Sequence, residues 1–153
     1  MVRAFLNRTT YDRLTRTAKI PCLLLMRVAR VAGWAGIAAI TILSLLPGVE
    51  RPHSGLPGQV EHFAAYACTG IALSLAYLDL RQRLVFWLSL AAASGVFEIL
   101  QIWIPGRDAK LQDALVSTLG ITAGLLIGAS LAAQVLAELP VKYPEKQRQE
   151  ANE

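Results

Sequence analysis

The chain has 153 residues, of which 54% are hydrophobic and 17% charged, and its mean hydropathy is +0.44. Soluble domains carry about 25% charged residues, so this composition indicates a membrane protein and argues against a globular core inside a polar shell. The net charge of +4 flanks apolar segments and is not gathered on one polar face. That distribution favours anionic lipid head groups, and not nucleic acid, as the partner.

Four apolar segments follow one another along the chain, at 31–46, 63–78, 84–104 and 114–137. A helix of about 20 residues crosses the hydrocarbon core of a bilayer. The last two segments reach that length alone, and the first two reach it once their flanking turns are counted. Because the connections are short, sequential helices are expected to be neighbours. The sequence therefore predicts an all-α integral membrane bundle of four antiparallel transmembrane helices.

The distribution of lysine and arginine predicts the orientation of this bundle. Seven lie at or before residue 30, two in the 79–83 loop and three after residue 137, against three in the other two loops. Because cytoplasmic loops are enriched in these residues, we expect residues 1–30 to be a basic cytoplasmic segment, 31–137 the membrane domain, and 138–153 a polar cytoplasmic tail. The first span lacks a small-residue cleavage site, so it is read as retained and not as a signal peptide.

The segment before the first span has the pattern of an amphipathic surface helix. Pro21 falls inside that segment and is expected to interrupt the helix. The alternative is that this segment is only a basic lead-in to the first span.

Polar side chains are expected to gather at the outer end of the bundle. Glu61 and His62 enter the second helix there, and Tyr66 lies one turn deeper on the same face as His62. On the third helix Glu98 and Gln101 share a face, with Glu98 about 9 Å below the end of that helix at Ile104; Ser94 and Gly95 continue the face and leave room for a neighbouring backbone. The candidate ligand-binding residues are Glu61, His62, Tyr66, Glu98, Gln101, Arg107, Asp113 and Ser117.

Two of these candidates, Asp113 and Glu98, have competing structural interpretations. A carboxylate such as Asp113 at a helix start satisfies free backbone N–H groups, a contribution of about 1 kcal/mol. An intramembrane carboxylate such as Glu98 costs about 3 kcal/mol on insertion scales, which favours a function over a purely structural pair with Arg107. No cofactor is expected. Metal binding by His62, Glu98 and Asp113 is not favoured either, since the set has one histidine and no paired spacing.

The fourth helix carries a stripe of small residues. Gly120, Gly124 and Gly128 recur every four residues on the face that presents Asp113 and Ser117. Such a seam lets another helix approach closely. We expect it to serve helix packing.

Three motifs together resemble the VanZ-like family of small membrane proteins. They are EHFAAY at 61–66, EILQIWIPGR at 98–107 and DALVSTLGITAG at 113–124. The family has a His-Phe-x-x-Tyr signature, a Glu-x-x-Gln helix leading to Pro-Gly-Arg, and an Asp-x-x-x-Asn-x-x-Gly helix. The marked positions fall here on His62, Tyr66, Glu98, Gln101, Arg107, Asp113 and Gly120. Ser117 stands where the family has asparagine, and Gly58 and Gln59 stand where it often has Asp-Lys.

The resemblance implies a multi-pass protein of the bacterial inner (plasma) membrane. The founding member of the family is associated with low-level teicoplanin resistance, so an effect on glycopeptide susceptibility is the expectation that the resemblance brings. The resemblance implies no catalysed reaction.

Three functions remain open from the sequence. In the first, a non-enzymatic cell-envelope protein binds a lipid-linked or peptidoglycan-related ligand in an outer polar pocket, with Arg107 as the anion contact. In the second, a membrane enzyme acts on a lipid phosphate or acyl bond with His62 as general base and Glu98 or Asp113 orienting it. In the third, the polar cluster only locks the bundle. The oligomeric state is left open.

Overall fold

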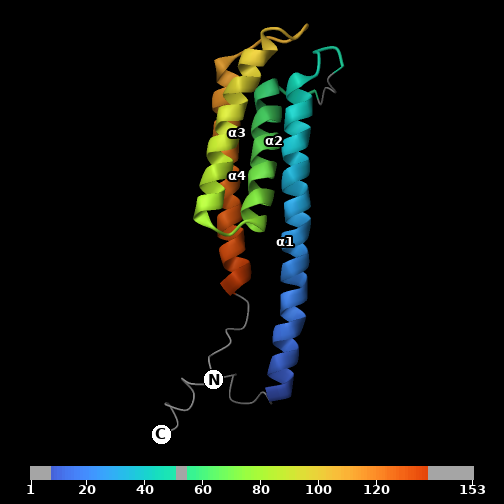
Figure 1. Ribbon diagram of the computed structural model, residues 1–153, viewed down its shortest axis with the longest axis vertical. Helices are drawn as coiled ribbons and strands as arrows, with labels where there is room; N and C mark the ends of the chain where they lie inside the picture. The colour runs from blue at the N-terminus through green and yellow to red at the C-terminus, as the bar shows by residue number, and fades with distance from the viewer. Residues whose placement is uncertain (1–7, 51–54, 138–153) are drawn as a thin grey trace.

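The computed structural model describes residues 8–50 and 55–137, and these form an all-α bundle. Its four helices are α1 (Arg8–Leu45), α2 (Gly58–Ala76), α3 (Leu80–Gln101) and α4 (Leu111–Ala137). In Figure 1 the α1–α2 and α3–α4 connections lie at the upper end, and the α2–α3 connection lies at the lower end of the three shorter helices. The upper end carries the dipeptides 47–48 and 105–106 and is called the Pro-Gly end here. The predicted tail at 138–153 and the first seven residues lie outside the described part.

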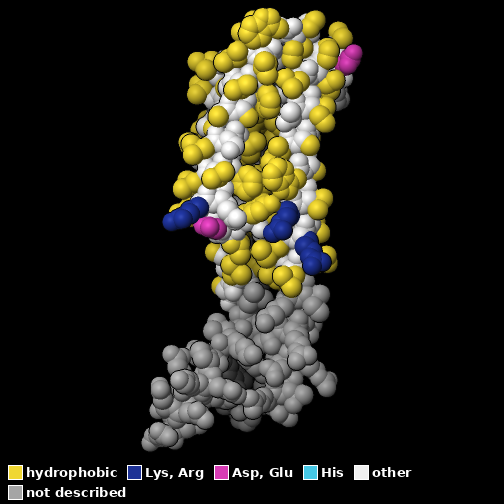
Figure 2. All heavy atoms as spheres, in the orientation of Figure 1, with side chains coloured by type: hydrophobic (Ala, Val, Ile, Leu, Met, Phe, Trp, Pro, Cys, Tyr) yellow, Lys and Arg dark blue, Asp and Glu magenta, His cyan; other side chains and the backbone are white. Residues whose placement is uncertain are grey.

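Three of the helices have the length and composition of membrane spans. These segments are Pro21–Leu45, Leu80–Gln101 and Leu111–Ala137. Large apolar side chains point away from the bundle along them, including Val31 at 70% and Leu119 at 62% exposure, and the surface in Figure 2 is largely apolar between its two ends. Such extensive apolar exposure is unfavourable in water, so these helices mark the chain as a membrane protein.

The helix α2 holds the bundle together, because it packs most extensively on α4 and next on α1. A Cβ at Gly120 would lie 2.6 Å from the Phe63 carbonyl oxygen, and one at Gly128 would lie 2.7 Å from that of Ile71. Between them, a Cβ at Gly124 would lie still closer to the Ala67 carbonyl oxygen. The glycine seam of α4 therefore packs against the backbone of α2.

The helix boundaries differ from the expectations at two places. The helix α1 continues through Pro21, so the expected interruption is wrong; proline removes one backbone hydrogen bond, but the apolar segment around it still favours a helix. The helix α3 ends at Gln101 and not at Ile104, because Ile102, Trp103 and Ile104 donate to carbonyls three residues back. Glu98 is therefore within one turn of the end of α3.

Gly95 does not have its expected role either. Nothing lies within 4 Å of a Cβ built at this residue, so it gives no neighbouring backbone a close approach. Ser94, next to it, is buried at 3% exposure, and its hydroxyl donates to the Ala91 carbonyl and, at 3.5 Å, to that of Ala114 on α4. The face of α3 that meets α4 therefore runs through Ser94 and Glu98.

The opposite end of the bundle is basic and is tied to the α2–α3 connection. Arg83 donates from Nε to the Tyr77 carbonyl and from Nη2 to that of Ser74, each at 3.0 Å. The Arg30 guanidinium lies 5.1 Å from the centre of the Tyr77 ring, within reach of a cation–π contact. Figure 2 shows the basic side chains of this face gathered at that end.

Candidate functional site

The two connections at the Pro-Gly end interlock. The Gly48 N–H donates to the Pro105 carbonyl at 3.1 Å, and a Cβ at Gly48 would collide with the carbonyl of Gly106. Gly106 itself has φ +73°, a left-handed conformation that favours glycine. The Pro-Gly-Arg turn therefore rests directly on the turn that follows α1, with no room for a side chain between them.

Gln101 and Arg107 fasten the end of α1 to this turn. Gln101 is 3% exposed, and its Nε2 donates to the Ser44 carbonyl at 2.9 Å. Arg107 Nη2 donates to the same carbonyl at 3.0 Å and to that of Leu43 at 3.1 Å. The last carbonyls of a helix lack partners within the helix and attract positive charge. Both side chains therefore cap α1, a contact that the sequence did not suggest for either.

Glu98 connects α3 to the start of α4. It is 8% exposed, and its Oε2 accepts a hydrogen bond from the Lys110 backbone N–H at 2.8 Å. Lys110 precedes the first residue of α4, so a side chain from α3 supplies the acceptor that a helix start requires. Arg107, Lys110 and Asp113 are the charged groups that act on the Glu98 carboxylate.

His62, Tyr66 and Ser117 form a polar contact between α2 and α4. The Ser117 hydroxyl lies 3.4 Å from His62 Nδ1 and also hydrogen-bonds the Tyr66 phenol. Tyr66 and Ser117 are 2% and 1% exposed, whereas His62 is half-buried. The glycine seam of α4 brings the two helices close enough for this contact, beginning one turn below Ser117.

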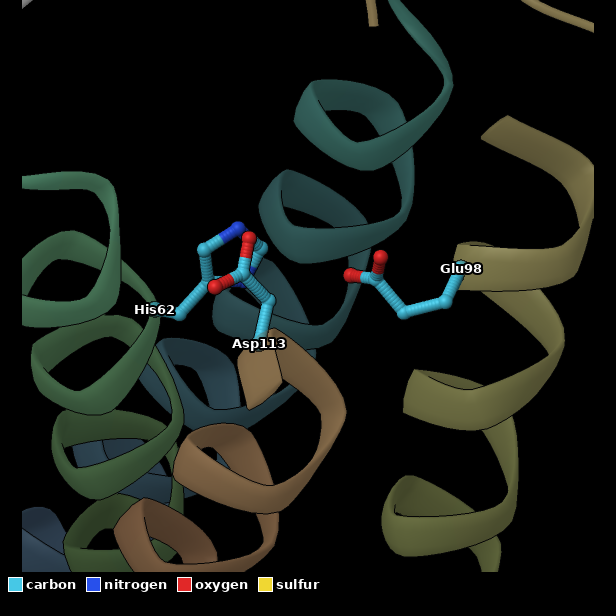
Figure 3. A group of neighbouring side chains, drawn as sticks. All are labelled: His62, Glu98 and Asp113. Atoms are coloured by element: carbon cyan, nitrogen blue, oxygen red, sulfur yellow. The ribbon is translucent and has the colours of Figure 1, made fainter. Parts of the chain in front are cut away.

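The side chains of His62, Glu98 and Asp113 converge from three helices. One ligand atom from each lies within 4.8 Å of the other two, and Figure 3 shows the Glu98 carboxylate pointing from α3 toward the other two side chains. Asp113 is in the first turn of α4, yet its Oδ1 is buried and has no hydrogen-bond partner among the described residues. That oxygen therefore does not cap α4, and the capping interpretation of Asp113 does not apply to it.

The eight candidate residues thus separate into two groups. His62, Tyr66, Glu98, Asp113 and Ser117 form one connected polar cluster, called the three-helix cluster here. Gln101 and Arg107 bind the end of α1, and Glu61 lies half-buried beside His62 on α2, outside the group of three that share ligand distances. The carbonyls of Leu43 and Ser44 and the N–H of Lys110 were missed, because backbone atoms leave no signal in residue types.

The absence of paired ligand spacing in the sequence, which argued against a metal, does not apply to this arrangement. It considered ligands paired along one helix, whereas His62, Glu98 and Asp113 come from α2, α3 and α4. By chemistry the three can accept hydrogen bonds from hydroxyl or ammonium groups, exchange a proton through the imidazole, or coordinate a cation.

A small cavity lies near the basic end and not near this cluster. It has a volume of about 20 Å³ and is lined by apolar side chains of α1, α2 and α4, among them Cys22 and Leu75. That volume suits about one water molecule, so the cavity is too small for a lipid head group. Comparison of the chain with family models, curated proteins and solved structures found no match.

Proposed function

We propose that this chain is a VanZ-like protein of the bacterial plasma membrane with four antiparallel spans and both termini in the cytoplasm. Three motifs in matching order support the family assignment. The three long apolar helices support membrane insertion, and α2, packed between α1 and α4, would be the fourth span. The basic residues at the end opposite the Pro-Gly turns support the orientation, by the positive-inside rule.

In this proposal the three-helix cluster binds the polar head group of an envelope lipid or a lipid-linked peptidoglycan precursor at the outer membrane face. The observation that carries the proposal is the convergence of His62, Glu98 and Asp113 within 4.8 Å near one end of the bundle. Buried carboxylates within a membrane domain usually face a partner or a watery site. Their acceptor oxygens suit the hydroxyl and ammonium groups of sugars and amino acids.

Within this proposal Arg107 is not the anion contact that the sequence suggested. A free guanidinium would grip a phosphate with two parallel hydrogen bonds, but Nη2 of Arg107 already donates to two α1 carbonyls. Arg107 therefore acts by fixing the Pro-Gly-Arg turn, and the ligand contacts belong to the three-helix cluster.

A second candidate function is a membrane enzyme that acts on an acyl or phosphate ester. The observation in its favour is the Ser117 hydroxyl 3.4 Å from His62 Nδ1, with two carboxylates near the same imidazole. A serine, a base and an orienting acid are the parts of a nucleophilic site. Ser117 is only 1% exposed, so a substrate could not reach its oxygen without movement of α2 or α4, and binding ranks first.

Two measurements test the proposal. Purified protein in detergent should be stabilised against heat by envelope lipids or lipid-linked precursors, because a ligand bound only to the folded state raises its stability, by about 2.7 kcal/mol at 100 times Kd. The Asp108→Asn variant should respond equally, since Asp108 is an exposed acid in the connection that precedes α4, whereas Asp113→Asn should respond less. Ester hydrolysis by wild-type protein that Ser117→Ala abolishes would favour the enzyme.

A test in cells compares a deletion strain with strains complemented by wild-type protein or Glu98→Gln. Loss of the head-group site should change teicoplanin susceptibility or lipid composition in the deletion strain. Wild-type protein should restore both, and Glu98→Gln should not. Equal restoration by both proteins would show that the Glu98 carboxylate is not required for the function.

A further inference from the structure

We propose that His62, Glu98 and Asp113 bind a zinc ion at the Pro-Gly end of the bundle. The ion would join α2, α3 and α4 through one imidazole nitrogen and two carboxylate oxygens. The zinc site uses the same three side chains as the proposed head-group site, but its test does not rest on that proposal, since metal binding is measured without any lipid ligand.

The distances between the donor atoms fit such an ion. The three ligand atoms lie within 4.8 Å of one another. Around a tetrahedral Zn²⁺ with bonds of about 2.1 Å, neighbouring ligand atoms lie about 3.4 Å apart. The side chains therefore need to close by about 1.4 Å at most. Changes in side-chain torsions supply that movement without a shift of the helices.

The environment of the cluster calls for a cation. Asp113 Oδ1 is fully buried and has no hydrogen-bond partner among the described residues. A buried polar atom without a partner is rare in native proteins and usually marks a ligand, a water or an ion. The neighbouring carboxylate of Glu98 is itself only 8% exposed. Two ionised carboxylates this close repel each other, and a cation bound between them would remove that repulsion.

Two of the ligands, His62 and Glu98, also contact groups that are not ligands, as metal ligands in proteins usually do. His62 Nδ1 faces the hydroxyl of Ser117 at 3.4 Å, which would leave Nε2 as the nitrogen that binds the metal. Glu98 Oε2 accepts the Lys110 N–H at 2.8 Å, which holds the carboxylate while its other oxygen coordinates. Such outer contacts fix the tautomer and the orientation of metal ligands.

The donor set favours zinc over other common ions. One imidazole and two carboxylates, without a thiolate, suit Zn²⁺, whereas Mg²⁺ and Ca²⁺ take six or more oxygen ligands. Three protein ligands leave the fourth position of a tetrahedral ion open. A phosphate oxygen of a lipid head group fits that position, and the ion would provide the anion contact that Arg107 does not.

The experiment uses the full chain, purified in detergent and stripped of metal with a chelator. Zinc chloride is then added, and bound zinc is measured by mass spectrometry of the metal and by competition with a chromophoric chelator. Saturation at one zinc per chain is expected. Cobalt(II) in place of zinc should give the intense visible absorption of a four-coordinate site, and its band should change in His62→Gln.

The variants separate ligands from bystanders. His62→Gln and Asp113→Asn should each weaken zinc binding by at least about 100-fold, and Ser117→Ala by about 10- to 100-fold. A matched control, Asp108→Asn, removes an exposed carboxylate at the same end and should bind zinc as wild type does. Circular dichroism verifies that each variant is helical. Glu98→Gln is not used alone, because Glu98 also accepts the Lys110 N–H, so a change in affinity there would not report on zinc coordination alone.

Two outcomes would overturn the zinc site: no saturable zinc binding by the wild-type chain, or unchanged affinity in both His62→Gln and Asp113→Asn. Tighter binding of Mn²⁺ than of Zn²⁺ would overturn the choice of metal. Zinc binding without any lipid-dependent stabilisation would support the zinc site and overturn the proposed head-group ligand. Lipid-dependent stabilisation of a chain that binds no zinc would support the head-group ligand and overturn the zinc site.

Discussion

Glu98 on α3 accepts a hydrogen bond from the backbone N–H of Lys110 at 2.8 Å, so the side chain of one helix closes the start of the next. The contact links the Pro-Gly-Arg turn to the three-helix cluster, because Lys110 ends the turn and Asp113 follows three residues later. Glu98 thus has a structural role and lies within ligand distance of His62 and Asp113. The two roles can be separated by the choice of substitution.

We expect Glu98→Leu to be less stable than Glu98→Gln. The glutamine amide oxygen can still accept the Lys110 N–H, whereas leucine leaves this donor without its acceptor, at a cost of about 1–3 kcal/mol. Thermal unfolding in detergent measures the difference. Asp108→Leu, an exposed position in the same connection, serves as the control and should unfold like wild type. Equal stability of the leucine and glutamine variants would show that the cap contributes nothing.

The glycine seam predicts a second contrast, between Gly124→Ala and Gly95→Ala. A Cβ at Gly124 would collide with the Ala67 carbonyl, whereas one at Gly95 meets nothing within 4 Å. Gly124→Ala should therefore destabilise the bundle by about 1–3 kcal/mol through overpacking. Gly95→Ala should be neutral or stabilising by up to about 1 kcal/mol, because alanine favours the helix. Denaturation of both variants in one detergent checks the pair, and equal losses would contradict the packing of α4 on α2.

The glycine seam and the Glu98–Lys110 contact show what could and what could not be predicted from the sequence. The seam could be predicted because small residues at a spacing of four mark a close helix contact, and Gly120, Gly124 and Gly128 do meet α2. The partner of Glu98 could not be predicted, because its acceptor oxygen meets a backbone N–H, which every residue except proline carries. For the same reason Arg107 was expected to bind an anionic group of the ligand, whereas its Nη2 donates to the backbone carbonyls of Leu43 and Ser44.

The shared Ser44 carbonyl makes Gln101 and Arg107 a coupled pair. Gln101→Leu and Arg107→Lys should each loosen the last turn of α1, and their effects on stability should not add. Residues in one hydrogen-bond network couple by about 0.5–3 kcal/mol. A double-mutant cycle on thermal unfolding measures the coupling. Hydrogen exchange at the end of α1 should rise in both single variants.

The control for this cycle pairs Arg107→Lys with Gly95→Ala. Gly95 has nothing within 4 Å of its Cβ position and no side chain that could contact Arg107, so these two effects should add. Additive behaviour of Gln101→Leu with Arg107→Lys would mean that the two side chains hold α1 independently.

The proposed orientation predicts which ends of the helices reach the outside of the cell. Ala109 lies in the α3–α4 connection at the Pro-Gly end, and Gln82 lies at the start of α3 at the basic end; both are exposed. With Cys22 and Cys68 replaced, Ala109→Cys should react with a membrane-impermeant thiol reagent in intact cells. Gln82→Cys should react only after lysis. Because Arg81 and Arg83 flank Gln82, the positive-inside rule predicts that this end is cytoplasmic. Ser54 lies between α1 and α2 in the sequence and outside the described residues; in the proposed antiparallel bundle Ser54→Cys should react as Ala109→Cys does. Labelling of Gln82→Cys but not Ala109→Cys in intact cells would show that the protein has the opposite orientation. The three-helix cluster would then lie at the cytoplasmic face of the membrane.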